Sequence, residues 1–129
     1  VRESRMTATP QPEDDKPEAE GEKPDPDDEK LVTLARAARA RIMAEHGAAV
    51  RDDTGRTYSG ADVTIGGRAI TALQLALAQA RAAGAKGIEA AAVVGGGPCD
   101  ISDVAAEGGP GIPVWIADRK GTVTDRLVT

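Results

Sequence analysis

Large hydrophobic side chains are rare in the first 30 residues and then recur along the chain in three patterns. The first pattern repeats every three or four residues, as on one helical face, at Leu31, Leu34, Ala35, Ala38 and Ile42. Before this stripe, Asp25 is a suitable N-cap and Pro26 a suitable first helical residue. The acidic residues that follow would stabilise a helix N-terminus, which is the positive end of the helix dipole. A helix is therefore predicted from Pro26, with Gly47 as its stop.

The second pattern is that of β-strands separated by turn residues. Residues 48–65 contain two β-prone runs on either side of the turn-rich quartet 52–55, and they predict a hairpin. Residues 112–118 and 122–128 predict two more strands, which are joined by a turn at residues 119–121.

The third pattern is continuous. Residues 69–87 are apolar on most sides and predict a buried helix that ends at Gly84, and residues 88–94 predict a central strand. Three glycines and a proline at 95–98 end that strand, and residues 100–107 predict a short helix. The order is α-β-β-α-β-α-β-β, which indicates an α/β domain of one sheet with helices packed against it.

The N-terminal segment differs in composition from the rest of the chain. Residues 1–30 hold five of the eight prolines and 11 acidic against 5 basic residues. Such a segment buries too little apolar surface to offset the entropy of ordering it. We therefore expect residues 1–28 to be a disordered acidic tail, and residues 29–129 to form the folded domain. A basic protein is the partner that such a tail would suit.

Composition also excludes several classes of function. The only aromatic residues are Tyr58 and Trp115 and no basic stripe is present, so nucleic-acid binding is not expected. No apolar run approaches the ~20 residues that span a bilayer, so no membrane association is expected. The single cysteine, Cys99, excludes an intramolecular disulfide. A cytoplasmic location is the resulting expectation.

The stretch Val93 to Ser102, VVGGGPCDIS, is the part of the sequence most suggestive of chemistry. Cys99 is either a reactive thiolate near a helix N-terminus or an inert, buried thiol, and the absence of a recognisable base favours the second interpretation. The glycines either cradle a small anion or nucleoside or form a plain strand-to-helix turn. The turn is favoured because a P-loop Gly-Lys-Ser/Thr is missing.

The chain resembles the small cytidine deaminases over roughly residues 29–127. The resemblance rests on EHGAAVRDDTGRTYSGADV, TALQLALAQARAAGAKGIEAAAVV, GGGPCDIS and GIPVWIADRKGTV, which together match the family's first hairpin, second helix, central strand, Pro-Cys turn and following strand. It implies a three-layer α/β/α fold with one mixed sheet of about five strands, and a homo-oligomer that is a dimer or a tetramer.

The resemblance also implies a chemistry that this chain does not retain. In the family, one Cys or His and two Cys hold a zinc ion, and a glutamate moves protons for the metal-bound water. Here Thr71 and Ser102 correspond to two of the ligands, and Leu73 corresponds to the glutamate. Only Cys99 keeps a ligand position, and Ala72 keeps the alanine between ligand and glutamate. No bound metal or other cofactor is expected, and zinc would be the cofactor if the family chemistry were retained.

The remaining positions carried over from the family define a candidate ligand pocket. Asp62 and Thr64 correspond to the ribose-binding residues of the hairpin, and Ala72, Pro98 and Asp100 complete the candidate pocket. Asp100 is within reach of a metal at Cys99, but two such residues make a weak zinc site.

The sole histidine does not belong to this predicted set. His46 follows the first helix, and we expect it to lie far from the two helix N-termini that form the site. The resulting hypothesis is a pseudo-deaminase that serves as a binding or assembly module. The alternative is an active cytidine or pyrimidine nucleoside deaminase with an atypical site.

Overall fold

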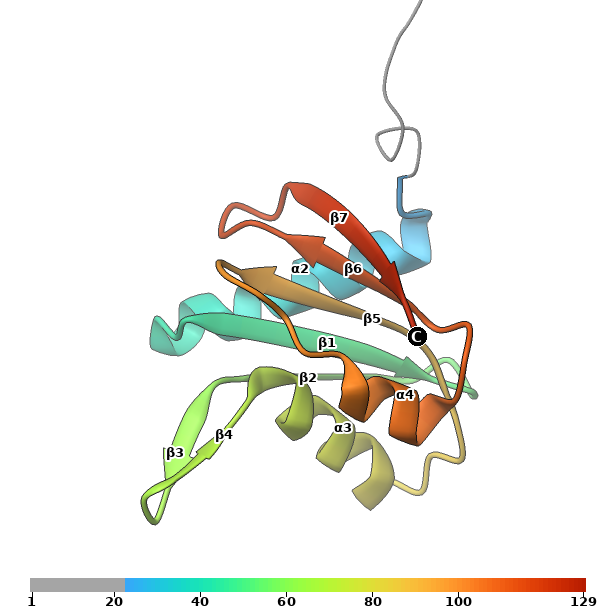
Figure 1. Cartoon of the computed structure of the whole chain (residues 1–129), viewed down its shortest axis with the longest axis horizontal. Helices are drawn as coiled ribbons and strands as arrows, with labels where there is room; N and C mark the ends of the chain where they lie inside the picture. Colours follow the sequence, from blue (N-terminus) through green and yellow to red (C-terminus); the bar gives the residue numbers. More distant parts are fainter. Residues whose placement is uncertain (1–22) are drawn as a thin grey trace, which may run out of the picture.

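The computed structural model describes residues 23–129, which form a five-stranded sheet between helices (Figure 1). Residues 1–22 of the predicted tail lie outside the described residues, whereas residues 26–28, which the tail prediction also included, form the first turn of the first helix. The elements are α2 (Pro26–Ile42), β1 (His46–Asp52), β2 (Thr57–Ala61), β3 (Val63–Ile65), β4 (Arg68–Ile70), α3 (Ala72–Ala82), β5 (Ile88–Gly95), α4 (Ser102–Gly108), β6 (Pro113–Ala117) and β7 (Val123–Val128). No helix in this part of the chain combines the length and hydropathy needed to cross a bilayer.

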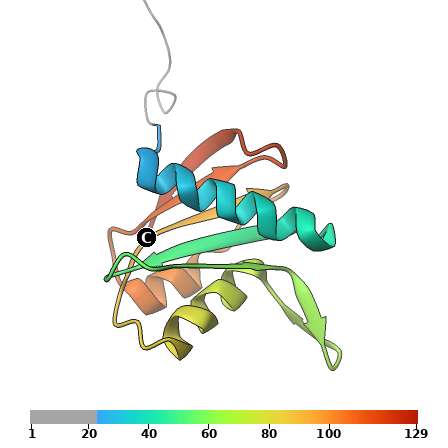
Figure 2. The same cartoon turned by 180° about the vertical axis from the view of Figure 1, so that it is seen from behind.

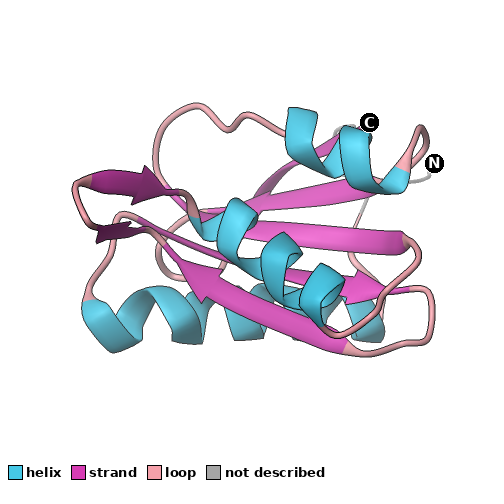
Figure 3. Cartoon of the chain, turned by 90° about the horizontal axis from the view of Figure 1, so that it is seen from below, coloured by secondary structure: helices cyan, strands magenta, loops and turns pink. Residues whose placement is uncertain are grey.

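The sheet is mixed, with strand order β2-β1-β5-β6-β7. Strand β5 runs parallel to β6 and antiparallel to β1, while β2 and β7 pair antiparallel at the two edges. Helix α2 covers one face of the sheet, and α3 and α4 cover the other (Figures 2 and 3). The predicted α/β/α class and five-stranded mixed sheet are therefore confirmed.

Alternating side chains of β5 supply both halves of the core. Ala91 and Val93 pack with α3, whereas Ala90, Ala92 and Val94 pack with α2. All five are almost completely buried, as expected for a central strand. Their small size lets both helices lie close to the sheet.

The first helix ends earlier than the sequence predicted. It stops at Ile42, and Met43 adopts a left-handed conformation with φ of 53° and caps it. Gly47, the predicted stop, lies inside β1 instead. A glycine is needed there because a Cβ would collide with the carbonyl oxygen of Ala35 on α2.

An additional hairpin separates the first two strands from α3. The apolar run predicted as the second strand is split at Asp62, and β3 and β4 follow as a two-stranded ribbon that projects from the body in Figure 1. Gly66 and Gly67 form its turn with φ of 58° and 80°, values that suit consecutive glycines in a tight hairpin. Helix α3 consequently begins at Ala72 and not at residue 69.

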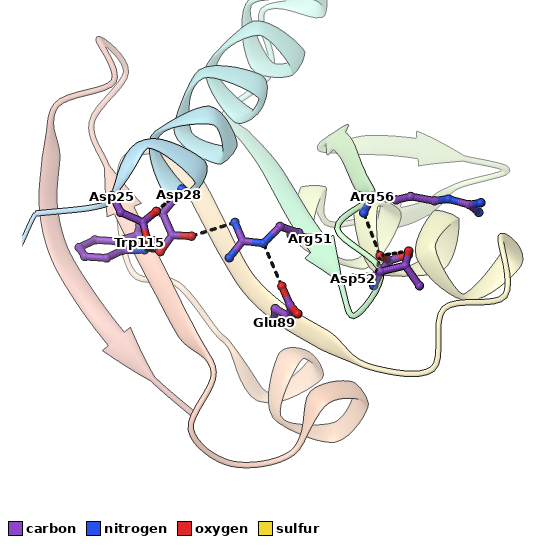
Figure 4. A network of polar contacts seen from close by, with 8 residues as sticks. Asp25, Asp28, Arg51, Asp52, Arg56, Glu89 and Trp115 are labelled. Carbon is purple, nitrogen blue, oxygen red and sulfur yellow. Dashed lines mark hydrogen bonds and ion pairs between the residues drawn. The ribbon is translucent and has the colours of Figure 1, made fainter.

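A buried polar network joins α2 to the sheet (Figure 4). Asp28 Oδ1 accepts a hydrogen bond from Arg51 Nη1 at 2.9 Å, and Arg51 Nε donates to Glu89 at 3.1 Å. Asp28 Oδ2 accepts from the indole N–H of Trp115 at 2.8 Å. Trp115 is 4 % exposed and packs in the core. The network fixes α2 across β1, β5 and β6.

Candidate functional site

A cavity of about 500 Å³ opens where β5 ends and α3 begins. Its lining comes from the start of β1, the β3–β4 ribbon, the first turn of α3 and the segment after β5. The lining residues are His46, Asp62, Val63, Thr64, Ala69, Ile70, Thr71, Ala72, Leu73, Val93, Pro98, Cys99 and Asp100. The set contains no lysine or arginine, so no permanently cationic side chain faces a ligand there.

The first turn of α3 forms the inner wall of the cavity. Thr71 is the N-cap: its hydroxyl oxygen accepts from the Gln74 backbone N–H at 3.0 Å, and the Gln74 side chain accepts from the Thr71 N–H in return. Leu73 is 5 % exposed and packs in the core beneath the cavity. The side chain of Leu73 is a hydrocarbon, which neither accepts nor donates a proton.

The turn after β5 brings Pro98, Cys99 and Asp100 to the opposite wall. Burial, together with the negative charge of Asp100, raises the pKa of the Cys99 thiol. A hydrogen bond from the Ser102 backbone N–H, 2.9 Å from Oδ1, lowers the pKa of Asp100. In this environment Cys99 is mostly a neutral thiol near neutral pH, which does not favour a role as a free nucleophile.

His46 lies in this cavity, so the expectation that it is remote from the site is wrong. The antiparallel register pairs His46, the first residue of β1, with Gly95, the last residue of β5. Its Nδ1 lies 2.8 Å from Oδ2 of Asp62, and its Nε2 lies 2.6 Å from the carbonyl oxygen of Gly96. The other carboxylate oxygen of Asp62 accepts from the Ala72 backbone N–H at 2.7 Å.

Both ring nitrogens of His46 face groups that only accept hydrogen bonds. A carboxylate and a backbone carbonyl have no proton to give, so both nitrogens donate and the ring is an imidazolium. Burial lowers the pKa of His46, but the hydrogen bonds to Asp62 and Gly96 and the charge of Asp62 outweigh it and raise the pKa overall. His46 is therefore already protonated and fully engaged, and it is not a free general base.

The structure brings most of the predicted site residues together. Thr71, Ala72, Leu73, Asp62, Thr64, Pro98, Cys99 and Asp100 all line the cavity. Ser102 does not line it and forms the start of α4. The sequence analysis missed His46, Val63, Ala69, Ile70 and Val93. His46 could have been found by pairing its strand antiparallel to the central strand.

The side chains present do not fit a zinc ion. Residues 23–129 contain no group of three or more His, Cys, Asp or Glu side chains arranged for a metal. The Thr71 hydroxyl caps α3 and both His46 nitrogens are engaged, which leaves the Cys99 sulfur and the Asp100 carboxylate as donors. Zinc needs deprotonated sulfur or free nitrogen donors, and this cavity offers neither in sufficient number.

Comparison with known proteins identifies the family. The model of the family described as "Cytidine deaminase-like" matches residues 24–121, so the chain belongs to this family. A search of the curated proteins finds no match.

Solved structures support the same fold. The cytidine deaminase from Burkholderia pseudomallei is 30 % identical, with a TM-score of 0.63, and the match covers 78 % of this chain and 89 % of that one. The cytidine deaminase from Mycobacterium leprae is 21 % identical, with a TM-score of 0.62, and covers 81 % and 94 % of the two chains. The enzyme from Mycobacterium tuberculosis is 24 % identical, with a TM-score of 0.60, and covers 70 % and 85 %.

Proposed function

We propose that this chain is a catalytically degenerate member of the cytidine deaminase-like family, and that its cavity binds a small ligand without deaminating it. The observation that carries the proposal is that Leu73, the residue which the resemblance assigns to the family's proton-transferring glutamate, is a buried hydrocarbon that lines the cavity. Loss of a general acid–base group alone typically costs about 10²–10⁴ in rate. The donor set adds to this, because Cys99 and Asp100 are fewer than the three protein ligands that hold a catalytic zinc and its activated water.

The cavity favours an uncharged ligand of nucleoside size. Its volume of about 500 Å³ lies within the range of small-molecule sites, and most of its wall is apolar. The charge of Asp62 balances that of the His46 imidazolium. The remaining carboxylate, that of Asp100, gives the cavity lining a net negative charge. An anionic phosphate would meet that charge without a Lys or Arg to offset it, so a nucleoside is favoured over a nucleotide.

The first experiment measures the zinc content and the activity of the same sample. Untagged protein purified without chelator is analysed for metal by mass spectrometry and incubated with cytidine, with uridine followed by chromatography. We expect negligible zinc and no uridine, while cytidine raises the melting temperature and cytidine 5′-monophosphate does not. One zinc per chain that disappears in Cys99→Ala, together with turnover, would overturn the proposal.

The second candidate function is an atypical pyrimidine nucleoside deaminase. The observation in its favour is that an imidazole and two carboxylates, those of His46, Asp62 and Asp100, line the cavity. Against it, the hydrogen bonds of His46 and Asp62 are already made within the protein. Turnover of cytidine that falls on Asp100→Asn but not on Asp103→Asn would favour this candidate.

Self-association is the assembly role that the resemblance implies. Large apolar side chains that are exposed in the single chain include Ile42, Met43 and Ile65. Burial of such side chains between copies would remove them from water. Light scattering coupled to size exclusion distinguishes a monomer from the dimer or tetramer that we propose.

A further inference from the structure

The His46–Asp62 pair connects three separate segments around the cavity. His46 begins β1, and Asp62 lies between β2 and β3. Asp62 also accepts a hydrogen bond from the backbone N–H of Ala72, in the first turn of α3. The remaining ring nitrogen of His46 reaches the Gly96 carbonyl, which opens residues 96–101, here named the cavity loop. One imidazolium therefore ties the cavity loop to the opposite wall of the cavity.

The beginning of the cavity loop has few packing contacts, whereas Cys99 and Ile101 at its far end pack against the core. Gly96, Gly97 and Pro98 are exposed, and nothing lies within 4 Å of a Cβ placed on Gly96 or Gly97. Strand pairing between β1 and β5 ends at Gly95. The bond from His46 to Gly96 is therefore the contact that holds the beginning of the loop beyond the end of the sheet.

We propose that His46 is a protonation-operated latch, which holds the cavity loop closed while the ring is an imidazolium and releases it when the ring loses a proton. A neutral imidazole has one N–H, so it donates to Asp62 or to Gly96 but not to both. The proton stays on the nitrogen that faces the carboxylate, because that hydrogen bond is the stronger. The lone pair of Nε2 then faces the Gly96 carbonyl oxygen. Because both atoms are acceptors, the hydrogen bond is lost and the loop is released.

The charged groups around His46 decide when the latch opens. Asp62 is its direct partner and Glu45 precedes it in the chain, and both favour the imidazolium. Cys99 and Asp100 line the same cavity from the loop. The first turn of α3 carries no acidic residue, and Arg68 on β4 is exposed and outside the cavity lining. The hydrogen bonds to Asp62 and Gly96 raise the pKa of His46, so the latch opens at a higher pH than an unperturbed histidine would allow.

Two unique side chains allow the latch to be followed in the wild-type chain. His46 is the only histidine, so its ring resonances report its protonation without assignment by mutation. Cys99 is the only cysteine and lies on the cavity loop, so its alkylation rate, divided by the thiolate fraction at each pH, reports loop opening.

The test is an NMR titration from acidic to alkaline pH, with thiol alkylation by iodoacetamide over the same range. We expect the amide chemical shifts of Gly96 and Gly97 to change with the same midpoint pH as the ring resonances of His46. The alkylation rate of Cys99, divided by its thiolate fraction, should rise several-fold across that midpoint. In Asp62→Asn both midpoints should move together to lower pH, whereas Glu89→Gln, which neutralises a carboxylate outside the cavity, should leave them unchanged.

Two results would overturn the latch: loop amides that ignore the His46 titration, or an alkylation profile in Asp62→Asn that coincides with that of the wild type. The wild-type titration decides the matter even where a variant folds poorly. These readouts follow the loop and not turnover, so the latch stands or fails independently of whether zinc or deaminase activity is found.

Discussion

The indole Nε1–H of Trp115 donates a 2.8 Å hydrogen bond to Oδ2 of Asp28, and so joins β6 to the first turn of α2. The two residues are 87 positions apart in the chain. Arg51 binds the second oxygen of the same carboxylate, which is thus shared by a strand on each side of β5. This shared carboxylate positions the helix that covers one complete face of the sheet.

Asp28→Ala should therefore destabilise the domain strongly. The change leaves the indole N–H and one arm of the Arg51 guanidinium buried without partners, and breaking a buried ion pair costs about 3–5 kcal/mol. Urea unfolding measures the loss. Asp27→Ala is the matched control, because Asp27 lies in the same helical turn and is exposed. Equal losses in both variants would mean that the helix dipole matters and the network does not.

Asp52 should make the stability of the domain sensitive to acid. Burial opposes its ionisation, but hydrogen bonds from Thr54, Arg56 and Tyr58 outweigh that and lower the pKa to about 2. A depressed folded-state pKa contributes stability that is complete above the unfolded-state value and is lost as the pH falls toward 2. Unfolding free energies between pH 6 and pH 2 should fall less steeply in Asp52→Asn than in the wild type.

The control for this pH dependence is Asp53→Asn, because Asp53 is its exposed neighbour. We expect its pH profile to follow that of the wild type. A profile for Asp52→Asn that parallels the wild type would show that other carboxylates dominate acid unfolding.

Gly95→Ala should disturb the cavity from the end of β5. Gly95 has φ of 144°, and a Cβ there would lie 2.7 Å from the His46 ring and would also collide with the Glu45 carbonyl. A strained backbone of this kind costs about 1–3 kcal/mol. The change should also displace the His46 ring resonances. Gly96→Ala is the control, because open space surrounds its Cβ, and its stability should change by less than about 0.5 kcal/mol.

The contrast between these two glycines shows what the sequence could predict. The run of Gly95, Gly96 and Gly97 correctly indicated that the central strand stops and a turn follows. Which glycine is indispensable depends on how closely β1 approaches, and that follows from strand register. The same limit explains His46: its place in the cavity depends on its pairing with Gly95, which no local pattern encodes.

The first helix shows the complementary case. Asp25 and Pro26 predicted its start correctly because capping is a local interaction: the Asp25 side chain accepts from the Asp28 N–H at 2.9 Å. Its end was misplaced because Met43 adopts the left-handed conformation that usually favours glycine. Gly47 is retained for close packing against α2, and its conformation does not end the helix.

Leu73→Glu should confer no deaminase activity, although it places a carboxylate where the resemblance predicts the family's glutamate. On the proposed function, the new carboxylate has no metal-activated water to act on, because the Thr71 hydroxyl is engaged in capping and Cys99 with Asp100 make too few zinc ligands. Loss of the buried leucine should also lower stability, by about 2–5 kcal/mol if the cost resembles that of Leu→Ala. Circular dichroism first establishes that the variant is folded at the assay temperature.

Leu73→Gln is the matched control, because glutamine has nearly the same shape as glutamate but carries no charge. Both variants are incubated with cytidine, with and without added zinc, and uridine is measured by chromatography. We expect no uridine in any of the four reactions, because a proton carrier alone supplies no nucleophile. Uridine formed by Leu73→Glu only when zinc is added, and not by Leu73→Gln, would mean that the cavity still holds a metal. That result would contradict the proposal that the cavity has too few ligands for zinc.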